Sequence, residues 1–313
     1  MIRKQNILWA YYLLSAAMPY PHSLRKLQSR KLGHEPSGKF LFIVGSGRSG
    51  NTLFRRLLME RYDIFIPPET YVLPRMVLDS LRTHKLGWAS RVDMTLSFLE
   101  HHPEFTTFAC DSLRPYALDA KNWSAQHRNL EELLIGLYRF LATASNMDSA
   151  WVGDKTPLNT LWLGVIGQAF PKARYIYLLR DGADVSVSYV KSGSYRELCD
   201  AGLRWVDSHN CWEAFKRNLP QSRYLEVRYE DLVKDPDGVL DAAVHLGIPS
   251  RNAKISVHHK LGDVSCREHH AKVSAAVDTS SIGKGRASLT PDERANLSKV
   301  LNTHLLRLGY PLL

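Results

Sequence analysis

Short apolar runs punctuate the chain, and a helical pattern follows each of them. The first, Phe40–Val44, ends at a glycine and has the length and the β-branched and aromatic content of a buried strand. A helical pattern extends from about Thr52 to Arg61. Two further runs, Tyr175–Leu179 and Tyr224–Val227, also precede helical stretches. Strands that alternate with helices predict an α/β fold, with a central parallel sheet flanked by helices on both faces.

The polar segment that precedes the first apolar run suggests where the folded domain begins. Residues 78–146 look mainly helical and carry no recognisable motif, and Gly33–Lys39 has the polar composition of a linker. We therefore expect an N-terminal apolar and basic arm with its linker at residues 1–37, and one domain at residues 38–313. The arm's apolar stretch, Ile7–Met18, is shorter than the ~20 residues of a membrane-spanning helix. It either packs on the domain or, with the basic residues up to residue 31, lies on an anionic membrane surface.

Composition narrows the class of protein but not its function. The 313 residues are 44% hydrophobic and 23% charged, as in soluble globular proteins. A formal net charge of +10 favours anionic partners, whether nucleic acid, membrane surface or a nucleotide with several phosphates. The four cysteines form no CxxC pair, which favours reduced thiols in the cytoplasm, with or without membrane association. A secreted protein with two disulfides stays an alternative.

A glycine-rich loop joins the first predicted strand to its helix. Its sequence, Gly45 to Thr52, allows backbone N–H groups to converge beside a helix N-terminus, which predicts a phosphate site. The spacing nearly satisfies the pattern G-x-x-x-x-G-K-[ST] of nucleotide triphosphatases, but Asn51 replaces the lysine. A cation is present instead at Arg48, inside the loop. The residues expected to hold the nucleotide here are Gly47, Arg48, Ser49, Gly50, Asn51 and Thr52.

These motifs resemble those of the sulfotransferases that use 3′-phosphoadenosine-5′-phosphosulfate (PAPS). Residues 40–58 look like the 5′-phosphosulfate loop of that family. Leu178–Gly182 together with Ser188 resembles its 3′-phosphate motif, in which an arginine at a strand end and a serine on the next helix clamp the phosphate. Pro68–Thr70 and Asp154–Pro157 look most like the tyrosylprotein sulfotransferase branch and its bacterial relatives. The resemblance implies PAPS as donor, its desulfated product PAP, and a fold like that of the P-loop kinases.

Two departures separate the chain from the tyrosylprotein branch. Lys191 and Ser192 stand near the position where that branch has a second arginine. Secreted members carry disulfides near their glutamate, whereas Pro67 and Pro68 precede Glu69 here. This removes support for an oxidising compartment and for tyrosine as the acceptor. A hydroxyl of a glycan or glycolipid is therefore our first expectation for the acceptor, and a peptide tyrosine the second.

Sulfuryl transfer requires a base, a positive charge at the transferring group and a grip on the nucleotide. Glu69 is the candidate general base, because it follows the first helix closely. Lys155 and Arg48 are the candidates for the positive charge. Thr52 can donate its hydroxyl, and it can equally serve as a helix cap. These assignments follow from the resemblance and from the demands of the reaction.

Five further residues are expected to contact the nucleotide. Arg180 and Ser188 match the 3′-phosphate clamp, and arginine's fork suits phosphate geometry. Lys284 and Arg286 lie in a glycine-containing segment that resembles the one closing over the nucleotide in this family. An ordinary basic surface loop explains that segment equally well. Tyr229 matches a tyrosine near the nucleotide in the tyrosylprotein branch, although a structural tyrosine is the alternative.

Two other classes of protein compete with this interpretation. A P-loop kinase or triphosphatase requires Mg²⁺, and we find no carboxylate after a strand in the position used to hold that ion. A basic module for nucleic acid is disfavoured, because the basic residues are dispersed, so no nucleic-acid partner is expected. His258–His259, Cys266 and His269–His270 lack a second cysteine and suitable spacing, so no metal site is expected.

Overall fold

The computed structural model describes residues 39–251, Val257 and residues 277–313. The expected arm at residues 1–37 lies outside these residues, so the proposed domain boundary stays a prediction. The two histidine pairs and Cys266 considered as zinc ligands also lie outside them. Cys110, Cys199 and Cys211 are free thiols.

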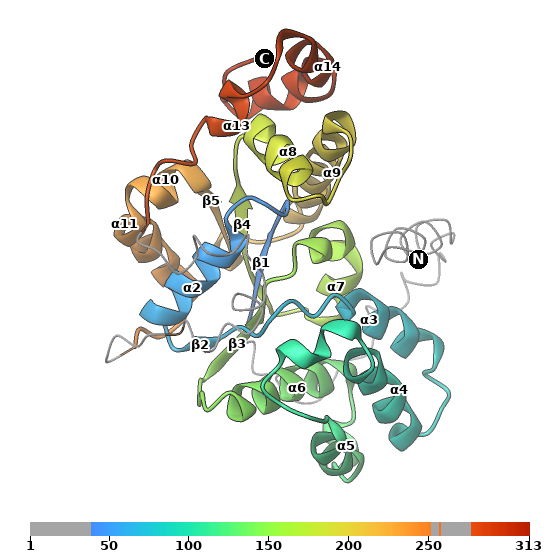
Figure 1. Ribbon diagram of the computed structural model, residues 1–313. Coiled ribbons are helices and arrows are strands. Elements are labelled where there is room, and N and C mark those ends of the chain that lie inside the picture. The colour runs from blue at the N-terminus through green and yellow to red at the C-terminus, as the bar shows by residue number, and fades with distance from the viewer. Residues whose placement is uncertain (1–38, 252–256, 258–276) are drawn as a thin grey trace. The chain divides into compact units, whose positions relative to one another are not determined.

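A five-stranded parallel sheet forms the centre of the domain, in the order β2-β3-β1-β4-β5 (Figure 1). Three strands contain the predicted runs, and two short ones were not predicted. The central strand pairs on both sides, since Leu41 lies opposite Gly153 on one neighbour and opposite Arg174 on the other. The strands are β1 (Phe40–Gly45), β2 (Ile64–Phe65), β3 (Trp151–Asp154), β4 (Arg174–Leu179) and β5 (Tyr224–Arg228).

Helices connect the strands, and residues 78–146 are mainly helical as predicted. Over the described ranges, no helix is both long enough and apolar enough to cross a membrane. The α-helices are α2 (Asn51–Arg61), α3 (Leu73–Arg82), α4 (Trp88–Glu100), α5 (Arg114–Lys121), α6 (Leu130–Ala144), α7 (Leu163–Ala169), α8 (Gly182–Lys191), α9 (Leu198–Lys216), α10 (Tyr229–Lys234), α11 (Pro236–Asp241), α13 (Lys284–Ala287) and α14 (Pro291–Arg307). Short 3-10 helices are η2 (Pro103–Thr107), η3 (Ala125–His127), η4 (Pro157–Trp162), η5 (Gln221–Arg223) and η6 (Ala242–Leu246).

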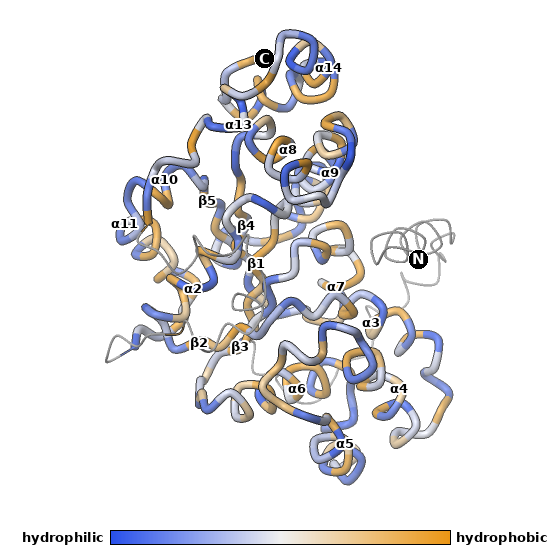
Figure 2. Tube along the Cα trace, viewed as in Figure 1, coloured by the Kyte–Doolittle hydropathy of each residue, from blue (hydrophilic) through white to orange (hydrophobic). Residues whose placement is uncertain are grey.

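Both faces of the sheet are covered. On one face, the Phe40 ring packs against Tyr138 of α6 and Phe170 after α7, at centroid distances of 4.9 and 4.6 Å. Tyr177 of β4 stacks on Trp212 of α9 at 5.0 Å. Helix α2 lies on the opposite side of the strands from α7 and α9 (Figure 1), and apolar residues gather along the central strands (Figure 2). The predicted α/β fold with helices on both faces is confirmed.

Because all strands are parallel, their carboxyl ends meet at one edge of the sheet, where ligands bind in folds of this class. The residues that follow the strands at this edge are those singled out in the sequence. They are the glycine loop after β1, Glu69 after β2, Lys155 after β3, Arg180 after β4 and Tyr229 after β5.

A buried histidine is expected to make the stability of this fold sensitive to acid. His209 of α9 lies 3.3 Å from the Tyr177 hydroxyl, and its ring meets that of His304 on α14 at 5.9 Å. Burial lowers the pKa of His209 to about 4, whereas an unfolded chain binds the proton at about pH 6.5. Between these values the unfolded state holds more protons, so stability is complete above about pH 6.5 and is lost as the pH falls towards 4.

We expect this single group to lower the free energy of unfolding by on the order of 3 kcal/mol across that window. Urea unfolding at pH 7.5 and pH 5 measures the part of this loss that falls above pH 5, about 2 kcal/mol. The variant His209→Gln should lose less stability than the native chain over the same interval. An equal loss in both proteins would show that another group causes the acid sensitivity.

Candidate active site at the carboxyl edge of the sheet

The glycine loop leads from β1 directly into the N-terminus of α2. Gly50 is the N-cap residue, and no side chain caps the helix there. Asn51 Nδ2 donates to the Ser46 carbonyl at 2.8 Å, so the residue that replaces the triphosphatase lysine closes the loop on itself. Ser49 is fully buried, and its Oγ has no hydrogen-bond partner in the described part of the chain. An unpartnered hydroxyl beside an uncapped helix N-terminus fits an anion such as phosphate or sulfate.

Two glycines of this loop allow aromatic side chains to approach the backbone. A Cβ at Gly50, where φ is 90°, would lie 2.5 Å from the Tyr229 ring. A Cβ at Gly47 would lie 2.5 Å from the Tyr189 hydroxyl. The loop is therefore packed between a tyrosine that follows β5 and one on α8. A side chain at either glycine would displace the loop.

Lys155 joins two other site candidates in one cluster. Its Nζ lies 2.5 Å from Glu69 Oε1 and donates to Thr52 Oγ1 at 3.2 Å. Lys155 is fully buried, whereas the Glu69 side chain keeps 16% of its surface exposed. The structure thus brings together residues that follow three different strands. Thr52 is not the helix cap, because Gly50 occupies that position.

Hydrogen bonds hold both ends of the loop that carries the candidate base. The fully buried Arg55 of α2 donates from Nη1 to the Pro67 carbonyl at 2.8 Å. Beyond the glutamate, Thr70 N donates to Thr156 Oγ1 at 3.1 Å, and Thr70 Oγ1 donates to Asp154 Oδ2 at 2.9 Å. Contacts to α2 and to the end of β3 therefore fix the carboxylate's position.

Asp154 corrects one expectation from the sequence. It ends β3, the direct neighbour of β1, so a carboxylate does follow a strand beside the glycine loop. Its Oδ2 also accepts from Tyr138 at 2.6 Å, and its Oδ1 accepts from Asn159 Nδ2 at 2.8 Å. Burial raises the pKa of Asp154, although hydrogen bonds from Tyr138, Thr70 and Thr156 act against this rise. Both carboxylate oxygens are thus engaged by neutral donors.

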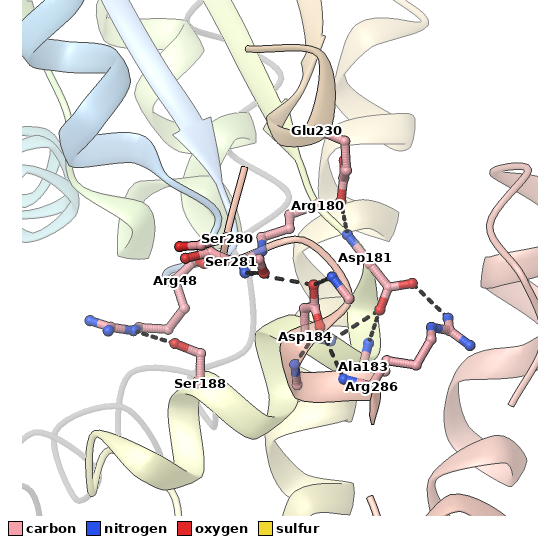
Figure 3. Close-up of polar contacts among 12 residues, drawn as sticks. Arg48, Arg180, Asp181, Ala183, Asp184, Ser188, Glu230, Ser280, Ser281 and Arg286 are labelled. Carbon is pink, nitrogen blue, oxygen red and sulfur yellow. Dashed lines mark hydrogen bonds and ion pairs between the residues drawn. The ribbon is translucent and has the colours of Figure 1, made fainter. Parts of the chain in front are cut away.

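The predicted 3′-phosphate residues meet the glycine loop (Figure 3). Arg48 Nε donates to Ser188 Oγ of α8 at 3.1 Å, and Arg180 Nη1 donates to the Arg48 carbonyl at 3.1 Å. The Arg180 guanidinium lies 4.3 Å from the centre of the Tyr229 ring, and its buried Nε has no partner among the described residues. Burial lowers the pKa of Arg48. Two guanidinium groups, a hydroxyl and an aromatic ring thus converge where a phosphate-bearing ligand can bind.

The two basic residues of the C-terminal segment are arranged differently from these. Arg286 Nη2 lies 2.6 Å from Asp181 Oδ2, and its guanidinium also donates to the carbonyls of Pro311 and Leu312. Its role at the nucleotide stays a prediction. Lys284 is exposed at the start of α13. The same segment reaches the site through a backbone group, since Ser281 O accepts from Arg180 Nη2 at 2.7 Å.

Sequence comparison identifies relatives along most of the chain. The Sulfotransferase family matches residues 41–251. Omega-hydroxy-beta-dihydromenaquinone-9 sulfotransferase Stf3 of Mycobacterium tuberculosis is 24% identical over 306 residues, which cover 86% of this chain and 75% of that protein. Protein-tyrosine sulfotransferase 1 of Danio rerio is 25% identical over 290 residues, or 86% of this chain and 72% of that protein. An uncharacterised protein of Aquifex aeolicus is 24% identical over 70% of this chain, which spans only 26% of that protein's length.

A solved structure has the same fold. The sulfotransferase domain of the Synechococcus PCC 7002 olefin synthase matches 91% of this chain and 99% of its own, with a TM-score of 0.60 at 23% sequence identity. Because the family match extends over residues 41–251, about two thirds of the chain, this chain belongs to the sulfotransferase family.

Proposed function

We propose that this enzyme transfers the sulfuryl group of PAPS to an acceptor hydroxyl, with Glu69 as general base and PAP as the released product. The observation that carries the proposal is the contact of Lys155 Nζ with both Glu69 Oε1, at 2.5 Å, and Thr52 Oγ1, at 3.2 Å, beside the glycine loop. A carboxylate and a cation thus adjoin a loop suited to an anion. In-line transfer to a hydroxyl needs these three components.

The donor would bind across the glycine loop and the arginine cluster. Ser49, Gly50 and the N-terminus of α2 would hold the 5′-phosphosulfate, since that helix end has no side-chain cap. Arg180 and Ser188 would hold the 3′-phosphate, with Tyr229 against the arginine. The unpartnered Ser49 Oγ and Arg180 Nε support an anionic ligand at each end of this region.

The reaction would follow from these positions. Glu69 takes the acceptor's hydroxyl proton while the acceptor oxygen forms a bond to sulfur, and the bond from sulfur to the phosphate oxygen of PAPS breaks. Lys155 and Arg48 neutralise the charge on the sulfuryl and leaving oxygens. An ammonium carries three protons, so Lys155 can keep its contact with Thr52 while it turns from Glu69 to the sulfuryl group.

We further propose a glycan or glycolipid hydroxyl as the acceptor, with the enzyme acting in the cytoplasm. The free thiols of Cys110, Cys199 and Cys211 agree with a reducing compartment. The acceptors named for the two sulfotransferase relatives, a hydroxylated menaquinone and a protein tyrosine, differ from each other. Turnover of PAPS with glycolipid, glycan and tyrosine-peptide acceptors would separate these classes, and sulfation of the peptide alone would contradict the proposal. Membrane contact through residues 1–31 stays a prediction.

Replacing Arg180 with alanine should weaken PAP binding selectively. Loss of a hydrogen bond to a charged group typically costs about 1.5–3 kcal/mol, or roughly tenfold to 150-fold in affinity. Adenosine 5′-phosphate, which lacks the 3′-phosphate, should bind the variant almost as it binds the native chain. Calorimetric titration with both nucleotides measures the difference, and Arg114→Ala, at the exposed start of α5, serves as the control.

The same titration separates the proposal from its main competitor. A P-loop kinase would bind ATP with Mg²⁺ more tightly than PAP, and EDTA would abolish its turnover. The sulfotransferase proposal expects preference for PAP and turnover that survives EDTA. Equal binding of PAP and adenosine 5′-phosphate by the native chain would count against PAPS as the donor.

A further inference from the structure

A buried aspartate on α8 binds the C-terminal segment through its backbone. Asp184 is 2% exposed. Its Oδ2 accepts a hydrogen bond from Gly283 N at 2.7 Å, and its Oδ1 accepts from Gly285 N at 2.8 Å and from Arg286 N at 3.0 Å. Figure 3 shows this carboxylate between α8 and the segment. Three N–H groups of one short stretch thus converge on a single side chain.

The same aspartate lies next to the arginine of the nucleotide site. Its Oδ2 is 3.6 Å from Arg180 Nη2, and that nitrogen donates to Ser281 O at 2.7 Å. Ser281 lies two residues before the first of the three bound N–H groups. The aspartate therefore acts on the guanidinium in two ways, by its charge and by holding the segment whose carbonyl binds the guanidinium.

A second carboxylate, at the N-cap of α8, also binds the segment. Asp181 caps the helix by accepting from the N–H groups of Ala183 and Asp184, and its other oxygen pairs with Arg286 Nη2 at 2.6 Å. The start of α8 thus serves as the attachment point of the C-terminal segment. The glycine at 285 permits this approach, because a Cβ there would lie 2.8 Å from Asp184 Cα.

We infer that Asp184 is a positioning residue for nucleotide recognition: it fixes the segment Ser281–Arg286 and thereby orients Arg180 towards the 3′-phosphate. The inference rests on the proposed function, in which Arg180 binds that phosphate. Asp184 does not touch the nucleotide itself, because its oxygens are already engaged by the segment. Its effect reaches the ligand through the direction of the guanidinium.

The substitution Asp184→Asn tests this with little change in volume. An amide offers one oxygen and places an NH₂ group where the carboxylate had its second acceptor, so at least one of the three N–H groups loses its partner. PAP affinity should fall about tenfold to hundredfold. Affinity for adenosine 5′-phosphate should change less than about threefold, because that ligand makes no use of Arg180. Hydrogen exchange of the Gly283, Gly285 and Arg286 amides should accelerate even without nucleotide.

Two further variants make the outcome decisive. Gly285→Ala should displace the segment sterically and reproduce the selective loss of PAP affinity while leaving the carboxylate intact. Asp79→Asn, which alters a buried aspartate paired with Arg75 on α3, should change neither nucleotide's affinity. Should Asp184→Asn fail to fold, Gly285→Ala alone decides the question.

Each result has a separate meaning. Unchanged preference for PAP in the folded Asp184→Asn and Gly285→Ala variants, or unchanged protection of the three amides in Asp184→Asn, would overturn the inference. If the native chain shows no preference for PAP over adenosine 5′-phosphate, the proposed donor is wrong instead. Equal weakening of both nucleotides in the Asp184→Asn variant would indicate a merely structural role and would also overturn the inference.

Discussion

Replacement of Glu69 by glutamine is expected to lower turnover by about 10²–10⁴-fold. The amide keeps the shape of the side chain and can still accept a hydrogen bond from Lys155, but it cannot take the acceptor's proton. PAP affinity should be nearly unchanged, because the residues proposed to hold the nucleotide remain in place. Single-turnover rates with bound PAPS, together with PAP titration, separate the chemical step from binding.

The control for this variant is Glu60→Gln, near the far end of α2, where the glutamate pairs with Arg56. It should leave turnover unchanged. Near-native turnover of the Glu69→Gln variant with its true acceptor would show that another group takes the proton. His84, which follows α3 and has its Nδ1 2.9 Å from the Leu81 carbonyl, would then be tested next.

The substitution Lys155→Met should lower turnover by about 10²–10³-fold, the usual effect of removing one group that stabilises transition-state charge. Methionine fills the buried volume but removes the contact of the ammonium with Glu69 and Thr52, so a decrease in stability of roughly 1–3 kcal/mol is also expected. Lys121→Met, which breaks a lysine–aspartate pair with Asp93, is the matched control and should affect neither quantity strongly.

A double-mutant cycle with Glu69→Gln tests whether the two residues act as one unit. If they serve the same step, the double variant should lose much less activity than the product of the single losses. Independent, multiplicative losses would contradict a shared role at the transferring group. Turnover of Lys155→Met close to the native value would remove the lysine from the mechanism altogether.

The strands that could be predicted were those with an uninterrupted apolar run, as in Phe40–Val44. Strand β3 was missed because Trp151–Asp154 contains a glycine and an aspartate, and β2 was missed because it has two residues. Both segments are strands because they pair with a neighbouring strand, and a local sequence pattern carries no information about that pairing. The pairing of β3 with β1 is also what makes Asp154 a neighbour of the glycine loop.

Motif spacing was enough to select most of the residues that converge at the sheet's edge. It could not give their partners. Arg286 was expected at the nucleotide because its segment resembles the one that closes over the nucleotide in this family. Its contacts with the carbonyls of Pro311 and Leu312 could not be read from that resemblance. Asp184 was not singled out from the sequence. Its backbone partners lie about 100 residues later in the chain, beyond the reach of any local signal.

The strand order also has a consequence for how the chain folds. Among the five strands of the described sheet, the central strand β1 is synthesised first, yet its neighbours begin with Trp151 and Arg174, more than 100 residues later. Until they emerge, a wholly apolar strand has both hydrogen-bonding edges unsatisfied, which is the condition that favours intermolecular association. Contacts of such long range also slow folding. Dilute conditions, with few chains in synthesis at one time, should therefore raise the yield of native protein, because a chain whose β1 is still unpaired then seldom meets another such chain.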